Sequence, residues 1–361
     1  MIALPQDVAF IIHKIEKAGF EAFAVGGCIR DSLLSRTPND WDITTSALPE
    51  QVKALFPHTI DTGIKHGTVT VMCHHVGYEV TTYRIDGEYE DGRHPKQVVF
   101  TPSLIEDLKR RDFTINAMAY NDSRGLVDAF EGQQDLQKGV IRAVGEPEKR
   151  FSEDALRIMR AVRFAAQLGY TIEEETEAAM RRLSDTLTKI SAERIQVELV
   201  KLLVSDHPGH MKILYETGIT KVILPEFDRM METEQNNPHH LYSVGMHTIR
   251  AMEEVPADKV LRLTMLFHDM GKPAKKTTDA EGIDHFHGHA ELSAKMAKEI
   301  LQRLKFDNDT IGKVTKLVKN HDRKIIPHAK YVRRALCDLG EEIFLLLLEV
   351  KHADVLSLIH I

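Results

Sequence analysis

The chain has 361 residues, of which 43% are hydrophobic and 28% are charged. These values are ordinary for globular proteins, so they exclude wholesale disorder, and the length predicts two or three domains. The formal net charge of -7 argues against a nonspecific nucleic-acid coat, although a local basic cleft can hold phosphates inside an acidic protein.

The first elements in chain order alternate helices with short strands. Pro5 begins a helix with apolar periodicity, and Gly19 ends it. Strands are predicted at residues 22–25 and 41–45 and in a hairpin around Gly77, at 68–72 and 79–83. From residue 153 onward the periodicity is almost entirely helical. The sequence predicts an α+β head at 1–145 and two helical domains at 146–233 and 234–361.

A glycine turn and a carboxylate pair stand in the predicted head. Gly26 and Gly27 follow a strand and precede a helix, which exposes backbone N–H groups to an anion, although such turns also merely relieve backbone strain. Asp40 and Asp42 are two residues apart on a predicted strand, so both carboxylates point to one face. Close like charges repel unless a cation lies between them, and this ligand type suits magnesium. The alternative is a turn aspartate followed by a solvated strand face.

Residues 153–168 predict a largely buried helix with one charged stripe. Asp154, Arg157, Arg160 and Arg163 are spaced by three and therefore lie near one another. Buried guanidinium groups need anions, which either a triphosphate or, in an ion-pair ladder, carboxylates of the head domain supply. Asp154 with Arg157 suits cytosine or adenine, because the carboxylate needs an amino donor that guanine and uracil lack at that position.

Two further segments contain candidate polar binding residues. Residues 110–120 predict an amphipathic strand that offers Arg111 to a phosphate and Asn116 to a ribose. In the last third, a His-Asp dipeptide, His268–Asp269, ends an apolar run and puts two metal-ligand types in a semi-buried position. Other candidate ligands on helical sequence are His247, His289, His321 and Asp354. A lone histidine is more often an ordinary core or surface residue.

Six motifs occur in order: GGCIRD at 26–31, NDWDITTSALPEQV at 39–52, RRDFTINAMAY at 110–120, DAFEGQQDL at 128–136, EDALRIMRAVRFAAQLGY at 153–170 and ERIQVELVKLL at 193–203. Over about residues 20–205 they resemble the bacterial class II tRNA nucleotidyltransferase and poly(A) polymerase family. The resemblance implies a polymerase-β-like head with a mixed sheet, a helical neck and body that bind nucleotide and RNA, and a helical HD domain.

The same resemblance assigns roles to residues of the head and neck. It implies Mg²⁺ on the catalytic Asp40 and Asp42, with Glu79 as a candidate third carboxylate, and a mobile element at residues 86–95. The incoming CTP or ATP is expected to contact Gly27, Arg30, Arg111, Asp154, Arg157, Arg160 and Arg163.

The histidine pattern is similar to that of the HD phosphohydrolase superfamily. This likeness implies a divalent metal, Ni²⁺ or Mn²⁺, on His247, His268, Asp269 and Asp354. It implies a second metal or a substrate phosphate on His287, His289 and His321. Relatives usually continue after the last ligand into a helical tail that grips tRNA, so the third domain is expected to be truncated, with a weaker hold on tRNA.

The function implied is template-independent addition of CCA to tRNA 3′ ends from CTP and ATP, with release of pyrophosphate. The alternatives are a poly(A) polymerase with the same pocket and, in another class, a metal-dependent phosphohydrolase whose head only binds RNA. No DNA or membrane partner is expected. The longest apolar stretch near the end, residues 343–348, is far shorter than the roughly 20 residues of a membrane helix, and the three cysteines are widely separated, which predicts a cytoplasmic protein.

Overall fold

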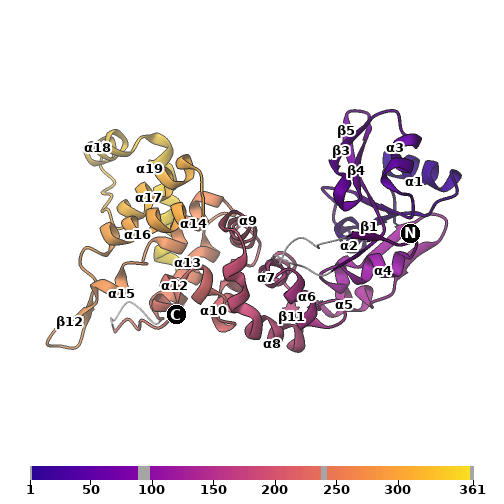
Figure 1. The fold of residues 1–361 in the computed structure, drawn as a ribbon. Coiled ribbons are helices and arrows are strands. Elements are labelled where there is room, and N and C mark those ends of the chain that lie inside the picture. The colour runs from indigo at the N-terminus through magenta and orange to yellow at the C-terminus, as the bar shows by residue number, and fades with distance from the viewer. Residues whose placement is uncertain (1, 88–97, 237–241, 358–361) are drawn as a thin grey trace. The chain divides into compact units, whose positions relative to one another are not determined.

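The computed structural model describes residues 2–87, 98–236 and 242–357, and the chain forms two compact units (Figure 1). The first unit is Met1–Arg157 with Thr171–Met180, and the second is Ile158–Tyr170 with Arg181–Ile361. The element predicted to be mobile, residues 86–95, lies outside the described residues from 88 onward. The domain boundaries at 145 and 234 remain predictions.

The first unit contains a seven-stranded sheet in the order β3-β4-β5-β2-β1-β8-β9. Its strands are β1 (Ala22–Val25), β2 (Asp42–Thr45), β3 (Thr59–Gly63), β4 (Thr68–Cys73), β5 (Val76–Thr82), β8 (Met118–Asn121) and β9 (Gly125–Asp128). β2 and β5 run parallel, and the other neighbours in the sheet are antiparallel. The α+β class and the mixed sheet of the head are therefore confirmed.

Helices and short strand pairs surround this sheet (Figure 1). They are α1 (Gln6–Lys17), α2 (Gly27–Leu33), α3 (Pro49–Leu55), α4 (Leu104–Lys109), α5 (Gly132–Lys138) and α6 (Pro147–Glu153), the 3₁₀ turns η1 (Ile64–His66) and η2 (Thr114–Asn116), and the strands β6 (Arg84–Asp86), β7 (Val98–Phe100), β10 (Val140–Ile141) and β11 (Thr171–Ile172). Helix α1 packs on β1 and α3 packs on β4. Phe23, Tyr83 and Leu108 are fully buried in one core cluster, which fixes α4 beneath the strands.

Two local predictions for the first unit are wrong. The hairpin of β4 and β5 turns at His74 and His75, which have φ values of 46° and 67°, whereas Gly77 lies within β5 opposite Met72. Two successive positive φ values match the twist of the flanking strands, and here histidines adopt them. The turn η2 replaces the predicted strand over residues 114–116, and the strand begins only at Met118.

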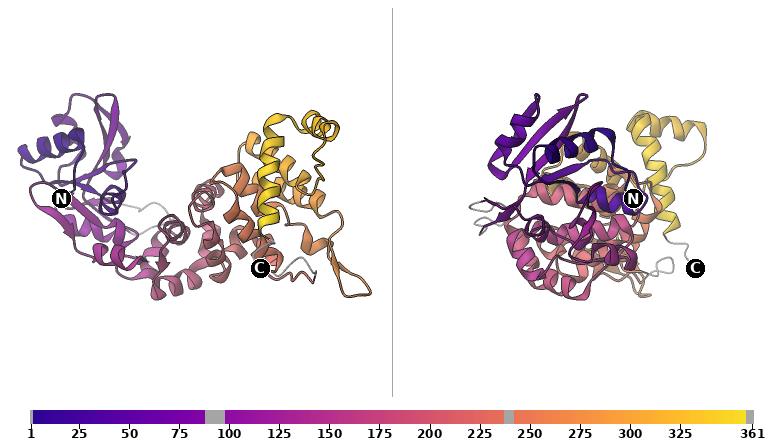
Figure 2. Two further views of the ribbon diagram at one scale, coloured as in Figure 1. Left: turned by 180° about the vertical axis from the view of Figure 1, so that it is seen from behind. Right: turned by 90° about the vertical axis from the view of Figure 1, so that its right-hand side faces the viewer.

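From α7 onward the described chain is helical apart from the short strand β11 and one small hairpin (Figure 2). Its elements are α7 (Leu156–Leu168), α8 (Glu174–Leu183), η3 (Ser184–Lys189), α9 (Ala192–Leu203), η4 (Pro208–His210), α10 (Met211–Glu216), α11 (Thr220–Ile223), α12 (Pro225–Met231), α13 (Val244–Glu254), α14 (Lys259–Phe267), α15 (Lys272–Lys275), β12 (Thr277–Thr278), β13 (Asp284–His285), α16 (His289–Arg303), α17 (Asn308–Asn320), α18 (Ala329–Leu339) and α19 (Glu341–Leu356). Among the described residues, no helix has the length and apolar character needed to span a membrane.

Capping residues set where the helices with predicted ligands begin. Ser243 Oγ accepts from the N–H of Met246 at 3.3 Å at the start of α13. Asp258 caps α14 and Asp307 caps α17 in the same way, each with a 2.8 Å bond. Each cap satisfies backbone donors of the first turn. The residues at the C-cap positions of α14 and α17 are His268 and His321, two of the predicted ligands.

We expect Gly132→Ala to destabilise the first unit by about 1–3 kcal/mol, since a Cβ there would press on the carbonyl oxygen of Thr114 and lie 2.9 Å from Met118 Cγ. Gly312→Ala in α17 is the matched control, because nothing lies within 4 Å of its Cβ and alanine favours a helix by about 1 kcal/mol. Scanning calorimetry of both variants tests this, and equal shifts would contradict the close approach of α5 to η2.

Candidate active site

Sheet register brings the glycine turn and the acidic residues of the first unit together. Val25 lies opposite Asp42 in the antiparallel pair of β1 and β2, so the turn at Gly26 is next to that aspartate. The parallel pairing of β2 with β5 puts Ile43 opposite Val80, which places Glu79 beside Asp42. Local sequence alone cannot give this juxtaposition, because it depends on which strands pair.

Two carboxyl groups of this site, those of Asp42 and Glu79, have a raised pKa. Loss of surrounding water is the main cause of the raised pKa of Asp42, Arg111 opposes it, and the negative charge of Asp40 adds to it. Loss of water also raises the pKa of Glu79, followed by the charges of Asp42 and Asp40. Partly dehydrated carboxyl groups beside a further carboxylate make a donor set for a hard divalent cation.

The glycine turn is lined by two of the predicted nucleotide-binding arginines. Gly26 has a φ of +86°, and a Cβ on it would lie 3.0 Å from Arg111 Nη1. Arg30 on α2, which begins at Gly27, donates from Nη1 to Asn116 Oδ1 at 2.8 Å. Gly27, Arg30, Arg111 and Asp42 thus share one region of the first unit. Their role toward a nucleotide stays a prediction.

Asp107 of α4 holds the arginine pair and was missed by the sequence analysis. Its buried carboxylate accepts from Arg110 Nε at 2.9 Å and from Thr44 Oγ1 at 3.0 Å, and it lies 3.6 Å from Arg111 Nη2. Burial acts to raise the pKa of Asp107, but Arg110 and Arg111 outweigh it and the pKa is lowered. The sequence does indicate this contact, because Asp107 precedes Arg110 by three residues and Arg111 by four. Side chains at these spacings lie near one another on a helix.

The charged stripe of the neck is broken by Asp154. The predicted single helix over 153–168 is wrong there, because α6 ends at Glu153, Asp154 has extended backbone with a φ of −144°, and α7 begins at Leu156. Asp154 Oδ1 accepts the N–H of Leu156 at 3.0 Å. Aspartate side chains compete with helical hydrogen bonds in this manner and favour helix starts.

Arg157 and Arg163 form internal ion pairs. Arg157 Nη1 lies 2.8 Å from Glu153 Oε2 in the first unit. Arg163 Nε lies 2.5 Å from Glu198 Oε2 of α9 in the second unit, and both side chains are buried. Arg160 lies over the ring of Phe164, with 5.3 Å between its guanidinium carbon and the ring centroid. Both carboxylates lie outside the predicted head at 1–145, so these two pairs are not the expected ladder to head carboxylates. Nucleotide contacts of the three arginines remain a prediction.

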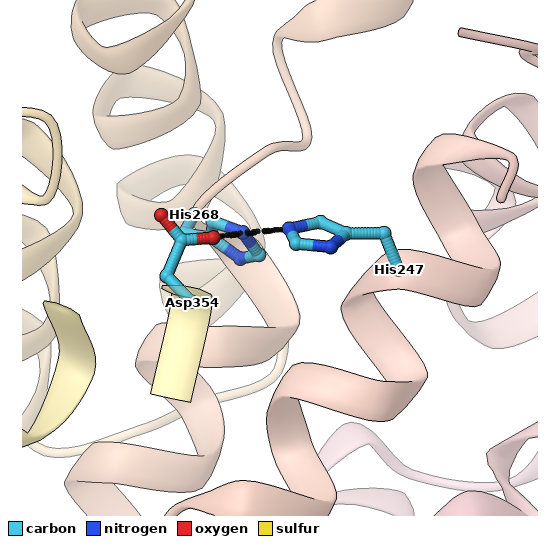
Figure 3. Close-up of side chains that lie close together, drawn as sticks. All are labelled: His247, His268 and Asp354. Atoms are coloured by element: carbon cyan, nitrogen blue, oxygen red, sulfur yellow. Dashed lines mark hydrogen bonds and ion pairs between the residues drawn. The ribbon is translucent and has the colours of Figure 1, made fainter. Parts of the chain in front are cut away.

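The second unit gathers predicted ligands from three helices (Figure 3). His247 Nε2 on α13 is 3.0 Å from Asp354 Oδ1 on α19 and 3.3 Å from His268 Nε2 at the end of α14. Asp269 Oδ2 is 3.3 Å from His268 Nε2. All four residues of the predicted metal site therefore lie together.

A second group of ligand atoms adjoins the first through Asp269. Its other oxygen, Oδ1, is 3.3 Å from His289 Nε2 and 3.7 Å from His321 Nε2, and these two nitrogens are 3.2 Å apart. His287, predicted to belong here, is exposed and in neither group of the described residues, and its ring stacks on that of His285 with 5.6 Å between centroids.

The histidines of both groups present the same ring nitrogen to the centre. Nδ1 of His268, His289 and His321 each contacts a backbone carbonyl oxygen, at 2.7, 2.8 and 2.7 Å. A carbonyl only accepts, so each Nδ1 carries the proton and, in a neutral ring, each Nε2 carries a lone pair. Carbonyl partners of this kind orient metal-binding histidines, and the donor set therefore fits a pair of divalent transition metals.

The carboxylates of this centre favour positive charge strongly. Burial acts to lower the pKa of His268, but Asp269 and Asp354 outweigh it and raise the pKa to about 10. Burial acts to raise the pKa of Asp269, but His268 and Lys272 hold it well below its usual range, and Lys272 Nζ lies 2.6 Å from its Oδ2. The centre is thus built to hold cations.

Comparison with known proteins places these features in a family. Residues 22–142 match the poly(A) polymerase head domain, residues 169–231 match the family described as the probable RNA and SrmB-binding site of polymerase A, and residues 239–359 match the HD domain. The CCA-adding enzyme of Leuconostoc mesenteroides is 55% identical over 204 residues, which are 56% of this chain and 51% of that protein. The CCA-adding enzyme of Lactobacillus helveticus is 49% identical over 239 residues, 66% of this chain and 60% of that protein.

A solved structure matches more of the chain. The Bacillus stearothermophilus CCA-adding enzyme in complex with CTP superimposes with a TM-score of 0.73 and 33% identity, covering 96% of this chain and 77% of that one. A nucleotidyltransferase head joined to helical domains is therefore the class that the fold defines. The chain belongs to the CCA-adding enzyme family. It spans about half the length of the first curated relatives that it matches.

We expect Glu198→Ala to lower the free energy of unfolding by about 3–5 kcal/mol, because it removes the carboxylate that faces the buried Arg163 guanidinium. Replacing both partners, as Glu198→Ala with Arg163→Met, should restore much of this loss, since no buried charge is then left alone. Urea unfolding of the two variants measures the difference. If Glu198→Ala alone were neutral, the ion pair would have no structural role.

Proposed function

We propose that this protein adds CCA to the 3′ end of tRNA, taking CTP and ATP as substrates and releasing pyrophosphate. The observation that carries the proposal is the meeting of Asp42, Glu79 and Arg111 at the glycine turn of a matching head domain. The relatives of this chain are named CCA-adding enzymes, and one of them was solved with CTP. Poly(A) synthesis with the same pocket is the alternative.

The reaction joins the 3′-terminal oxygen of the RNA to the α-phosphorus of the nucleotide and breaks the bond to pyrophosphate. Magnesium bound by Asp40 and Asp42, with Glu79 beside them, supplies charge stabilisation for the attacking and leaving oxygens. Arg111 and Arg30 supply positive charge to the phosphate oxygens of the nucleotide. Asp107 holds the Arg111 side chain in place through an ion pair and also binds the neighbouring Arg110. Catalysis of this type is mainly positioning and electrostatics.

Base selection is proposed for Asp154 and Arg157, as a carboxylate that accepts from an amino group next to a donating guanidinium. Both fall in the first unit with the carboxylates. A bidentate pair of this kind discriminates by about 1–3 kcal/mol, and unpaired buried polar groups add to the penalty for guanine and uracil.

For the second unit we propose metal-dependent hydrolysis of a phosphate ester, with Ni²⁺ or Mn²⁺ as the metal. The specific support is that Asp269 directs one oxygen to each of two ligand groups. Metals held by His247, His268, Asp269 and Asp354 and by His289 and His321 would supply Lewis acidity toward water and the phosphoryl oxygen. Lys272, which lies beside the shared aspartate, supplies a further positive charge.

We expect Asp42→Ala to reduce nucleotide incorporation by about 10³-fold or more, because the ligand set loses its central carboxylate. The assay incubates tRNA that lacks its CCA end with labelled CTP, ATP or both, and two C followed by one A is the expected product. Asp61→Ala is the control, as Asp61 is exposed on β3 and pairs with Lys53 at 3.1 Å. A long A tail would overturn CCA addition in favour of poly(A) synthesis.

We expect Asp269→Asn to lower the bound Ni²⁺ or Mn²⁺, measured by mass spectrometry after dialysis, and to abolish hydrolysis of a 2′,3′-cyclic nucleotide. His287→Ala, which changes a histidine outside both ligand groups, should keep its metal. CTP incorporation by each variant checks that the protein is folded. Wild-type protein that binds neither metal, or hydrolyses nothing with either, would count against this second function.

A further inference from the structure

Positive charge is concentrated in α18 and the segment before it. Residues 323–337 contain five Lys or Arg residues and one His, and they contain no Asp or Glu. These residues are Arg323, Lys324, His328, Lys330, Arg333 and Arg334. In a chain of net charge -7, this stretch is a local reversal of sign.

The fold turns these charges outward. α18 lies beside α19 in the helical bundle (Figures 1 and 2), where Ala335 and Leu339 are buried in a core cluster with Leu347. Lys330 and Arg333 lie on the exposed part of the helix. The helix is therefore held by its apolar face and presents a cationic one to solvent.

Most of this charge is available to an external anion. Within the described residues, no ion pair holds Lys324, Lys330 or Arg333. Arg323 is paired, with 2.7 Å between its Nη2 and Asp338 Oδ2. Closely spaced cations without carboxylate partners repel one another. A polyanion that binds several of them at once relieves this repulsion and therefore binds more tightly.

An aromatic surface adjoins the cations. Tyr331 is 48% exposed, and its ring lies 5.9 Å from that of His328, which is also exposed. Cations interleaved with exposed aromatic rings are typical of surfaces that bind single-stranded nucleic acid, where bases stack on the rings. A membrane surface would need a wide exposed apolar face, whereas the apolar side of α18 is turned into the core.

We propose that this basic face, formed by α18 with Lys324 and His328, binds the phosphate backbone of the RNA substrate, and that Tyr331 stacks on an unpaired base. The identity of the RNA as tRNA rests on the proposed function. The surface lies outside the segment that matches the RNA-binding family, residues 169–231, and so forms a separate contact.

The test compares two double variants of the full chain for binding to tRNA that lacks its CCA end, measured by fluorescence anisotropy over a range of salt. Lys330→Ala/Arg333→Ala should weaken binding by roughly 10-fold or more at about 0.1 M salt and reduce the slope of log K against log salt by about 1.4–1.8. Lys295→Ala/Lys298→Ala removes two exposed charges from α16 and should change neither quantity.

Tyr331 has its own pair of variants. Tyr331→Ala should weaken binding roughly 10-fold for RNA with unpaired bases and leave binding of a fully paired duplex unchanged, while Tyr331→Phe retains the ring and should bind normally. Equal affinity of wild type and Tyr331→Ala for unpaired RNA would overturn the stacking contact.

Turnover separates this proposal from the proposed function. With saturating tRNA, Lys330→Ala/Arg333→Ala should keep the wild-type kcat for CTP incorporation and raise the KM for tRNA. An unchanged tRNA affinity and salt slope in that variant would overturn the basic face alone. Absence of incorporation by the wild type would instead overturn the proposed function. The comparison of RNA binding by the wild type and the variant would still test the basic face.

Discussion

Partly dehydrated groups of the same kind are gathered at both chemical centres of this chain. In the head, loss of surrounding water raises the pKa of Asp42 and of Glu79, and the charge of Asp40 adds to both shifts. In the second unit, histidine Nε2 atoms face each other at 3.2–3.3 Å. Neither arrangement is stable as a set of free ionised carboxylates or free lone pairs, so each needs a cation or a proton. The scaffold must therefore hold these groups against their own repulsion.

The scaffold does this with buried hydrogen bonds behind the reacting face. Asp107 grips the arginine pair and Thr44 of β2, so one carboxylate ties the helix α4 to the strand that begins at Asp42. Backbone carbonyls play the equivalent part for the imidazoles of the second unit. At both centres the supporting groups form hydrogen bonds within the protein. The functional atoms are therefore oriented before any ligand binds.

Local sequence predicted the features that depend on periodicity and on side-chain chemistry. The helix from Gln6 and the strands β1, β2, β4 and β5 follow from spacing and residue type, whereas the closeness of His247, His268 and Asp354 was implied by the likeness to HD phosphohydrolases. Strand order did not follow, because Glu79 reaches Asp42 only through a parallel pairing between strands distant in the chain. The break at Asp154 was also missed, since the apolar pattern continues through it while the side chain competes for a backbone N–H.

The two proposed activities are chemically complementary. Nucleotidyl transfer needs a free hydroxyl at the RNA 3′ end, because a terminal phosphate or a 2′,3′-cyclic phosphate occupies the oxygen that must attack. Hydrolysis of the cyclic ester by water opens one phosphorus–oxygen bond, and hydrolysis of the resulting monoester frees the oxygen and releases phosphate. A hydrolytic centre in the same chain would thus convert blocked ends into substrates for the head, and RNA held on the basic face of α18 would stay near the protein between the two steps. Under these two proposals, the second unit would prepare RNA 3′ ends for the head and would contribute nothing to the transfer chemistry itself.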